Sequence, residues 1–441
     1  MAAARQSEGE GGPKLNMALI VAKFGGTSVA SPERIKNVAK RLVRIREDGN
    51  EVVAVVSAMG KTTDELLGLT NAITKNPPAR ELDRLLSTGE QVSMTLLAMA
   101  LEELGHRAMS FTGRQAGIKT DAFHNKAKIA EVHNERIVEA LDEGIIPVVA
   151  GFQGIDENGD ITTLGRGGSD TTAVAIAWGI AADVCEIYSD VDGVYTTDPR
   201  IAPRAHKLAA VSYDDMLELS SAGSGVLQSR AVEFARTWGV VIHARSAFSD
   251  AEGTYIKEDP EMEKAVITGI AHDTSEVKVT IRAVPDSAGV AARVFSALAE
   301  AMVNLDMIIQ NVGDGGVTDI SFTCPGADLP RAVAAMDAIL PEIGARGYAV
   351  DEDIAKVSLV GTGMKSSPGV TAKMFSTLGD NKINILAIST SPIRLSVVVD
   401  AAQATAAVQC LHTAFGLDSD SVFKETQLSA EEIAAKMAKG R

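Results

Sequence analysis

An internal repeat in the C-terminal half constrains the fold of this 441-residue chain more than any other feature of its sequence. One copy starts at Ala288 and reads A-G-V-A-A-R-V-F-S-A-L-A-E-A-M-V-N-L-D-M-I. The other starts at Pro368 and reads P-G-V-T-A-K-M-F-S-T-L-G-D-N-K-I-N-I-L-A-I. Equivalent residues lie 80 positions apart, as in the pairs Gly289 and Gly369, Phe295 and Phe375, and Asn304 and Asn384. A common offset through a glycine turn, a helix face and a strand entry predicts two copies of one β-turn-α-β module. Two structural modules that bind no ligand remain the alternative, because a fold does not fix a function.

The N-terminal half predicts a different architecture, an α/β domain with a mostly parallel sheet. Short apolar segments typical of buried strands occupy residues 18–24, 51–58, 145–152 and 184–190. Longer helical patterns lie between them, at residues 34–45, 91–104 and 171–181. This alternation indicates a sheet that helices cover on both faces. Because ligands of such sheets bind beyond the carboxyl ends of the strands, chemistry is expected in the loops at 23–28, 57–64, 151–154 and 189–193.

Chain length and these patterns together predict several domains, since 441 residues exceed one ordinary core. The expected order is a disordered leader at 1–16, an N-terminal domain at 17–250, a linker at 251–275, repeat modules at 276–350 and 351–425, and a tail at 426–441. The leader lacks the apolar core of a signal peptide, and no run of ~20 apolar residues predicts a membrane span.

Charge and cysteine content exclude several classes of function. The net charge of −16 argues against nucleic acid or an anionic membrane as the main partner, because phosphate groups need basic patches. The net charge does not exclude a nucleotide as a ligand. Three widely spaced cysteines, Cys185, Cys324 and Cys410, predict neither a disulfide framework nor a zinc site. Reduced thiols in a cytoplasmic protein are the favoured interpretation.

The loop Lys23-Phe24-Gly25-Gly26-Thr27-Ser28 is the first candidate for phosphate binding. Paired glycines let main-chain N–H groups approach phosphate oxygens, and the ammonium of Lys23 could reach a phosphoryl group in transfer. The loop does not have the P-loop spacing. Ordinary strand-turn glycines are the alternative.

The stretch T-T-L-G-R-G-G-S-D-T-T, residues 162–172, surrounds Arg166 with glycines and leads through Asp170 into a helix. A guanidinium pairs bidentately with a carboxylate, which suits an acidic substrate. A capped helix with a solvated arginine is the alternative. Glu90, at the start of another predicted helix, could pair with the ammonium of an amino acid.

The stretch Y-S-D-V-D-G-V-Y-T-T-D-P-R, residues 188–200, follows the last of these strands. Tyr195 and the polar groups could hold adenine or ribose while Arg200 reaches phosphate. Its D-x-D-G letters lack the rest of a calcium loop, so that interpretation is dismissed. The seven histidines form no metal or protease pattern, and no G-x-S-x-G elbow supports a hydrolase.

Taken together, these motifs resemble the aspartate kinases. That family carries, in this order, K-F-G-G-T-S-V, S-A-M-G-x-T-T-D-E-L, T-G-E-Q-V-S, F-T-G-R-Q-A-G, T-L-G-R-G-G-S-D-T-T-A and Y-S-D-V-D-G-V-Y-T-T-D-P-R. The repeat modules are similar to the family's paired regulatory ACT domains. The resemblance extends from Met17 to about Phe423 and points to the forms of high-GC Gram-positive bacteria. It implies an amino-acid-kinase fold, a mostly parallel sheet between helices, plus two ferredoxin-like βαβ modules.

The implied reaction transfers a phosphoryl group from ATP to L-aspartate and gives 4-phospho-L-aspartate, the first step toward lysine, threonine, methionine and isoleucine. An ionised β-carboxylate needs no general base, so positioning and neutralisation suffice. Mg²⁺ would enter on the nucleotide phosphates, with no metal site made by the protein alone.

The resemblance also implies residue roles. Lys23 and Asp170 are the expected catalytic residues: Lys23 stabilises the transferring phosphoryl group and Asp170 organises the cations and substrate. Substrate contacts are expected from Thr62, Thr63, Asp64, Glu90, Arg166, Gly167, Gly168 and Ser169. ATP contacts are expected from Lys23, Phe24, Gly25, Gly26, Ser57, Ser189, Asp190, Tyr195, Asp198 and Arg200. An amino acid effector, lysine or threonine, would contact Gly289, Gln310, Asn311, Asn384 and Ile385.

Two departures from the family pattern put rate and regulation in doubt. Gly225 stands where the family usually has a lysine that reaches the nucleotide phosphates, and Arg230 or Lys119 could compensate. Pro392 and the residues around Gly289 also differ, so altered feedback is expected. A catalytically impaired amino-acid sensor is therefore the alternative function, and a glutamate kinase is a third. Assembly into oligomers, or with a short subunit started near Met262, is expected.

Overall fold

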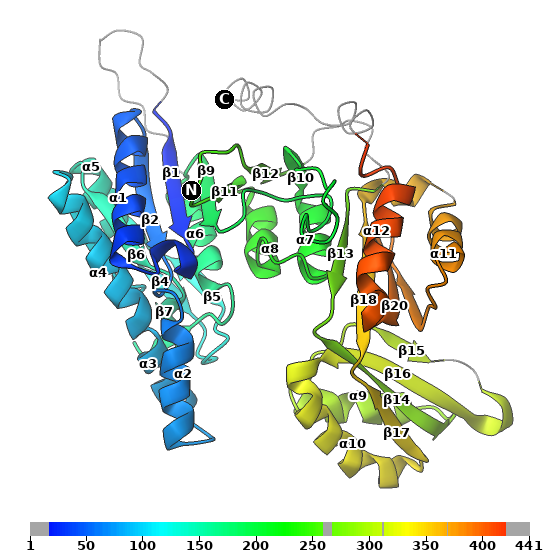
Figure 1. Cartoon of the computed structure of the whole chain (residues 1–441). Coiled ribbons are helices and arrows are strands. Elements are labelled where there is room, and N and C mark those ends of the chain that lie inside the picture. The colour runs from blue at the N-terminus through cyan, green and yellow to red at the C-terminus, as the bar shows by residue number, and fades with distance from the viewer. Residues whose placement is uncertain (1–16, 259–266, 311–312, 368, 420–441) are drawn as a thin grey trace.

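The computed structural model describes residues 17–258, 267–310, 313–367 and 369–419. It contains an N-terminal domain and two smaller α/β domains that correspond to the sequence repeat (Figure 1). We call the smaller ones the first repeat domain, built on β14 to β17, and the second repeat domain, built on β13 and β18 to β20. The predicted leader at 1–16 and tail at 426–441 lie outside the described residues.

An eight-stranded sheet forms the centre of the N-terminal domain, in the order β10-β12-β11-β9-β1-β2-β6-β3. The strands from β11 to β3 in this order are parallel, and β12 runs antiparallel to β11. Their bounds are β1 Leu19–Phe24, β2 Glu51–Val56, β3 Ala108–Phe111, β6 Ile146–Ala150, β9 Val184–Ser189, β10 Ala210–Ser212, β11 Ile242–Ser246 and β12 Thr254–Lys257.

Helices cover both faces of this sheet, because alternate residues of each central strand point to opposite faces. Ile20, Ala22 and Phe24 pack with α1 (Pro32–Glu47) and α4 (Thr88–Glu103). On the other face, Val21, Val53 and Val55 pack with residues of four helices: α5 (Glu135–Asp142), α6 (Gly168–Gly179), α7 (Tyr213–Ser221) and α8 (Ser229–Trp238). The predicted mostly parallel sheet between helices is thereby confirmed.

A smaller sheet, in the order β5-β4-β7-β8, extends the N-terminal domain beyond the carboxyl ends of the central strands. Its strands are β4 Ile118–Thr120, β5 Ile129–Val132, β7 Gln153–Ile155 and β8 Ile161–Thr163. Helices α2 (Thr62–Ile73) and α3 (Ala79–Leu86) lie in this region (Figure 1).

The two repeat domains have equivalent four-stranded sheets, β15-β16-β14-β17 and β19-β20-β18-β13. Gly289 and Gly369 precede the first helix of each with φ of 93° and 103°, a left-handed conformation that favours glycine. The strands are β13 Gly269–Asp273, β14 Glu276–Pro285, β15 Ile308–Gln310, β16 Val317–Pro325, β17 Gly347–Asp351, β18 Ile354–Val360, β19 Ala387–Thr390 and β20 Arg394–Asp400. The helices are α9 Val290–Glu300, α10 Leu329–Ile343, α11 Val370–Asp380 and α12 Ala404–Ala414.

The predicted linker at 251–275 is wrong, because it contains strands of two different sheets. β12 pairs with β10 and β11 in the N-terminal domain. β13 pairs antiparallel with β18 and so supplies the edge strand of the second repeat domain, although it precedes the first repeat domain in the chain. The first repeat domain is therefore an insertion between two hydrogen-bonded neighbours of the second.

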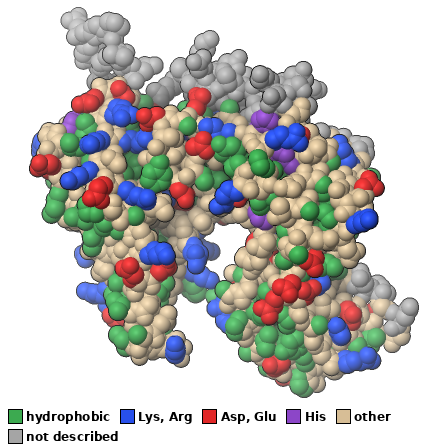
Figure 2. Space-filling view, viewed as in Figure 1, with side chains coloured by type: hydrophobic (Ala, Val, Ile, Leu, Met, Phe, Trp, Pro, Cys, Tyr) green, Lys and Arg blue, Asp and Glu red, His purple; other side chains and the backbone are tan. Residues whose placement is uncertain are grey.

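The second repeat domain lies against α7 of the N-terminal domain (Figure 1). Asp215 accepts hydrogen bonds from the Thr268 hydroxyl at 2.7 Å and from the Thr362 amide at 3.0 Å. Arg394 on β20 forms an ion pair of 3.3 Å with Glu218. Below this contact the N-terminal domain and the first repeat domain are separated by open space (Figure 2). None of the helices in the described ranges has the length and hydropathy that a membrane crossing requires.

Candidate active site

Four strand-end loops meet at one edge of the central sheet, as the sequence predicts. Hydrogen bonds continue the sheet pattern past the strands: the Gly25 amide donates to the Tyr188 carbonyl at 3.2 Å and the Ser57 amide to the Phe24 carbonyl at 3.1 Å. The Gly151 amide donates to the Val56 carbonyl at 3.0 Å. The loops after β9, β1, β2 and β6 are thus held side by side.

Gly26 allows the loops after β1 and β2 to touch. A Cβ atom at this position would lie 2.9 Å from the Ala58 carbonyl oxygen, so any side chain would push the loops apart. The Gly60 amide also donates to the Gly26 carbonyl at 3.0 Å. Gly25, by contrast, has its amide bonded to Tyr188, so its contribution to a phosphate site is the space that it leaves beside Lys23.

A buried ion pair occupies the centre of this edge. The Lys23 ammonium at the end of β1 lies 2.5 Å from a carboxylate oxygen of Asp170, which stands in the first turn of α6. Both residues are more than nine-tenths buried. The structure therefore brings together the two predicted catalytic residues, which are far apart in sequence.

Glu90 lies buried next to these loops, in the first turn of α4. One carboxylate oxygen accepts a hydrogen bond from the Ala58 amide at 3.1 Å. The other has no hydrogen-bond partner among the described residues. Burial raises the pKa of Glu90 to about 7, against the opposing effect of its main-chain hydrogen bonds. A cationic ligand would supply the missing partner.

Arg166 follows β8 on a loop that other side chains hold in place. Its own side chain is exposed and forms no ion pair within the described ranges. Arg230 from α8 donates to the Leu164 carbonyl at 2.7 Å and to the Ala127 carbonyl at 2.6 Å, and burial lowers the pKa of Arg230. Asp83, fully buried on α3, accepts a hydrogen bond from the Thr163 hydroxyl at 2.5 Å. The guanidinium of Arg166 is left available to a ligand.

The other predicted substrate residues lie at two helix starts. Thr62 begins α2, and its hydroxyl donates to the Met59 carbonyl at 2.7 Å. Asp64 is exposed in the same turn, next to Thr63. The second helix start is that of α6: Gly167 precedes the helix, and Gly168 and Ser169 are its first residues.

The predicted nucleotide residues divide into a buried and an exposed group. The Phe24 side chain is fully buried and stacks on Tyr188 with ring centres 4.8 Å apart, so only its main chain could face a nucleotide. The Tyr195 hydroxyl donates to Asp192 at 2.9 Å. Arg200 forms a two-pronged ion pair with Asp198, at 3.0 and 2.7 Å, on an exposed turn. Arg200 would have to leave Asp198 to reach phosphate. The remaining two, Ser189 and the exposed Asp190, lie where β9 ends.

Gly225, the position at which the resemblance leads us to expect a lysine, is bordered by open space. The residue is exposed, and a Cβ atom added to it would meet no other atom within 4 Å. Of the two predicted substitutes, Arg230 is bound to main-chain carbonyls and Lys119 is paired with Glu131 at 3.3 Å. Neither is available as a spare cation in this conformation.

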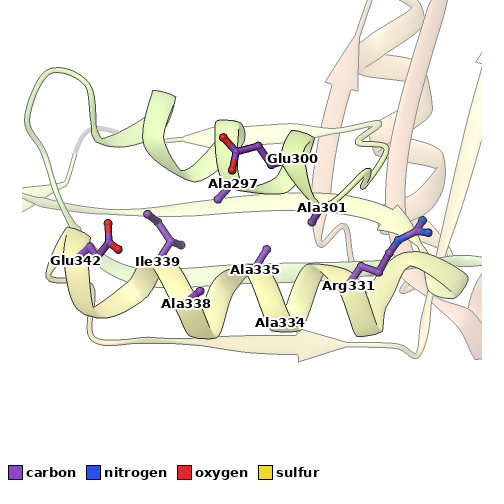
Figure 3. A pocket seen from close by; sticks show the side chains of 9 residues that line it. All are labelled: Ala297, Glu300, Ala301, Arg331, Ala334, Ala335, Ala338, Ile339 and Glu342. Atoms are coloured by element: carbon purple, nitrogen blue, oxygen red, sulfur yellow. The ribbon is translucent and has the colours of Figure 1, made fainter. Parts of the chain in front are cut away.

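The predicted effector residues lie on the repeat domains. Gly289 precedes α9, Gln310 ends β15, and Asn384 and Ile385 precede β19; Asn311 is outside the described residues. A groove of about 630 Å³ lies elsewhere, between α9 and α10, with alanines along its floor and Glu300, Arg331 and Glu342 at its rim (Figure 3). None of the four predicted effector residues that the structure describes lines that groove.

No group of three or more histidine, cysteine or carboxylate side chains in the described part of the chain is arranged to bind a metal ion. Asp170 is the carboxylate at the centre of the edge. One carboxylate beside a phosphate site suits Mg²⁺, which usually keeps several waters and is held by substrate phosphates.

Sequence reasoning did not identify Asp83, and it named Arg230 only as a possible substitute cation, not as a support for the main chain. Neither belongs to a motif in which its partner stands nearby, since Arg230 bonds residues 66 and 103 positions away. Only the fold brings these groups together.

Comparison with known proteins agrees with this geometry. Residues 18–244 match the Amino acid kinase family, and residues 277–339 and 357–415 match the ACT domain. The chain is 53% identical to the aspartokinase of Mycolicibacterium smegmatis over 410 residues, which is 92% of this chain and 97% of that protein. It is 52% identical to the aspartokinase of Corynebacterium glutamicum over the same length and shares.

Solved structures show the same fold. Clostridium acetobutylicum aspartate kinase superimposes with a TM-score of 0.72 at 26% identity, over 90% of this chain and 100% of that one. E. coli aspartokinase III in complex with aspartate and ADP superimposes with a TM-score of 0.75 at 24% identity, over 90% and 99%. The predicted resemblance is confirmed along nearly the whole chain, and this protein belongs to the aspartokinase family.

Proposed function

We propose that the chain transfers the γ-phosphoryl group of ATP to the β-carboxylate of L-aspartate at the edge formed by the loops after β1, β2, β6 and β9. The observation that carries the proposal is the buried pair of Lys23 and Asp170, with the half-satisfied carboxylate of Glu90 nearby. The near-full-length identity to aspartokinases favours this enzyme over an impaired sensor.

Aspartate would be held by charges of both signs. Glu90 would accept the α-ammonium on its unpartnered oxygen, and Arg166 would bind a carboxylate with its exposed guanidinium. Thr62, Thr63 and Asp64 would close the site from the start of α2. Gly167 and Ser169 would present main-chain N–H groups at the start of α6, where the helix dipole favours an anion. The Gly168 amide donates to the Gly165 carbonyl at 3.0 Å, so Gly168 would contribute through its lack of a side chain.

The β-carboxylate can attack directly, because it is ionised at pH 7 and needs no general base. Lys23 would leave its contact with Asp170, or share it, to neutralise the charge that builds on the transferring phosphoryl oxygens. Mg²⁺ bound to the nucleotide would neutralise further phosphate charge, with Asp170 as the carboxylate that faces it.

The nucleotide would occupy the segment that follows β9. Ser189, Asp190 and Tyr195 would contact ribose and base, and Arg200, released from Asp198, would reach phosphate. Ser57 and the main chain of Phe24, Gly25 and Gly26 would line the phosphates from the neighbouring loops.

A coupled assay of ADP release with aspartate, with glutamate and without a carboxylate tests the function. Release that depends on aspartate is expected, and Lys23→Met is the control that removes it. Equal rates with glutamate would favour a different carboxylate kinase. A rate of ADP release that is the same with and without either amino acid would overturn the proposal.

Regulation is proposed through the repeat domains. The solved complex of E. coli aspartokinase III with lysine and aspartate makes lysine a candidate effector, with threonine as the second. Gly289, Gln310, Asn311, Asn384 and Ile385 would bind it. Altered feedback is expected, and titration of the activity with lysine, threonine and both checks it; strong concerted inhibition at low millimolar concentration would contradict it.

We also propose that the chain assembles, either with itself or with a short subunit that starts near Met262, a position outside the described residues. Size-exclusion chromatography with light scattering measures the assembly of the purified chain. A band that persists after mutation of Met1 and disappears after Met262→Leu would identify the short subunit.

A further inference from the structure

The second repeat domain contacts the segment of the N-terminal domain that is proposed to bind the nucleotide. Residues 194–208 form a hairpin-like loop, in which the Leu208 amide donates to the Val194 carbonyl at 2.8 Å and the Thr196 amide to the His206 carbonyl at 2.9 Å. The loop includes Tyr195, Asp198 and Arg200, the residues proposed to contact ATP. Thr196 itself has no role in that proposal.

Helix α12 and the chain just after it contact this loop at three points. His412 Nε2 lies 2.9 Å from the Thr196 hydroxyl, and Gln409 donates to the Ile201 carbonyl at 2.8 Å. Asp418 forms an ion pair of 2.6 Å with Arg204. On the other side, the Ile270 amide of β13 donates to the Thr196 carbonyl at 2.7 Å.

The contact between His412 and Thr196 is the buried one of these side-chain contacts. The two residues are 2% and 1% exposed, whereas Gln409 and Arg204 are exposed. The Thr196 hydroxyl also accepts a hydrogen bond from the His206 amide at 3.0 Å. Because an unpaired buried polar atom is costly, removal of either partner would make the loop geometry unfavourable.

The same domain carries part of the proposed effector site. Leu411 of α12 packs in one core with Met374 of α11 and with Ile383, which directly precedes Asn384. A change in the packing of that core would therefore act on the helix that holds Thr196.

We propose that His412 is a positioning residue for the nucleotide: it fixes the 194–208 loop, so that affinity for ATP depends on the state of the second repeat domain. The inference rests on the proposed kinase function. It predicts that the KM for ATP changes and the KM for aspartate does not, because the residues proposed to bind aspartate lie elsewhere: Glu90 in the first turn of α4 and Arg166 after β8.

The test compares His412→Leu, Thr196→Val and the double variant with the wild-type chain. Each single variant should raise the KM for ATP about fivefold, the value expected for one net hydrogen bond, and leave the KM for aspartate unchanged. The double variant should resemble a single one, because both changes remove the same contact. His412→Gln replaces the imidazole with an amide that can donate or accept a hydrogen bond at similar reach, so it should recover most of the affinity.

Ser396→Ala is the matched control. It removes a buried hydrogen bond of 2.8 Å to Ser358 inside the same domain without touching the loop. If it raises the KM for ATP as much as Thr196→Val does, the effect is a general loss of stability and the inference fails. Additive effects of the two single changes, or an equal rise in both KM values, would also overturn it.

Calorimetric titration with ADP in the absence of aspartate separates this inference from the proposed function. Weaker ADP binding in Thr196→Val supports the role of His412 whichever carboxylate the enzyme uses. Unchanged ADP binding in both single variants refutes that role even if the wild-type chain phosphorylates aspartate.

Discussion

Replacing Glu90 with glutamine should reveal how much the buried carboxyl group of Glu90 lowers the stability of the fold. The buried carboxyl group has its pKa raised from 4.5 to about 7, and each pKa unit corresponds to ~1.4 kcal/mol. The ionised form is therefore disfavoured in the folded chain by roughly 3 kcal/mol.

The sign follows from proton linkage. Below pH 4.5 the group is protonated in both the folded and the unfolded chain, and it costs nothing. Between pH 4.5 and about 7 the folded chain binds more protons, so stability falls as pH rises; above about 7 the loss is complete. Glu90→Gln carries no such charge, so it should become more stable than the wild type by roughly 3 kcal/mol at pH 8 but not at pH 4.

Tryptophan fluorescence during denaturant unfolding measures this difference in the relevant domain. The two tryptophans of the chain, Trp178 on α6 and Trp238 at the end of α8, both belong to the N-terminal domain. Parallel pH dependences for the wild type and Glu90→Gln would refute the reasoning.

The same carboxylate should release a proton when aspartate binds. An ammonium group beside Glu90 would favour the ionised form, so about half a proton per site should be released at pH 7. Calorimetry in buffers of different ionisation enthalpy counts it, and Glu90→Gln should show none. Proton uptake, or a binding heat independent of buffer, would show that the ammonium does not reach Glu90.

Three further predictions concern the charges of the site. Gly225→Lys should raise kcat roughly tenfold or more, since it adds a cation where there is room for one. Gly225→Ala is the control, and an unchanged kcat in Gly225→Lys would mean that the absence of a lysine is not limiting. Asp170→Asn should abolish ADP release and destabilise the N-terminal domain by ~3 kcal/mol, because it leaves Lys23 buried without a counter-ion. The double variant Asp170→Asn with Lys23→Met should regain stability but not activity. An unaltered unfolding midpoint in Asp170→Asn would contradict this prediction. Arg230→Met should raise the KM for aspartate about tenfold and leave the KM for ATP unchanged, because it removes the hydrogen bonds that hold the loop after β8. Replacement of the exposed Arg236 on the same helix by methionine should change neither KM.

The sequence predicted the parts of this protein that depend on local pattern. Residues 18–24 were predicted as a strand buried on both faces of a sheet, and residues 19–24 form β1. Lys23 and Asp170 were each expected in the active site, one at a strand end and the other at a helix start, but their ion pair was not predicted. The offset of 80 residues likewise predicted two domains of one fold.

Other features depend on partners that no local pattern specifies. β13 has five residues, too few for a distinctive pattern, and its neighbour β18 comes only after the entire first repeat domain. The contact between Thr196 and His412 spans 216 positions. Arg230 was predicted as a possible substitute cation, whereas the structure uses it to hold main-chain carbonyls, a role that depends on how α8 packs against the loop after β8.

The insertion of the first repeat domain also sets an order of folding during synthesis. β14 to β17 are continuous in the chain, so their sheet can close as soon as Asp351 has left the ribosome. β13 leaves the ribosome earlier, but its partner β18 is made only after the whole first repeat domain. Pairing of β13 with β18 closes this long loop, which is slow. The chain order therefore allows the first repeat domain to fold before the second. Because α12 comes after all the strands of both repeat domains, we expect the 194–208 loop to gain its contact with α12 after the eight-stranded sheet has formed.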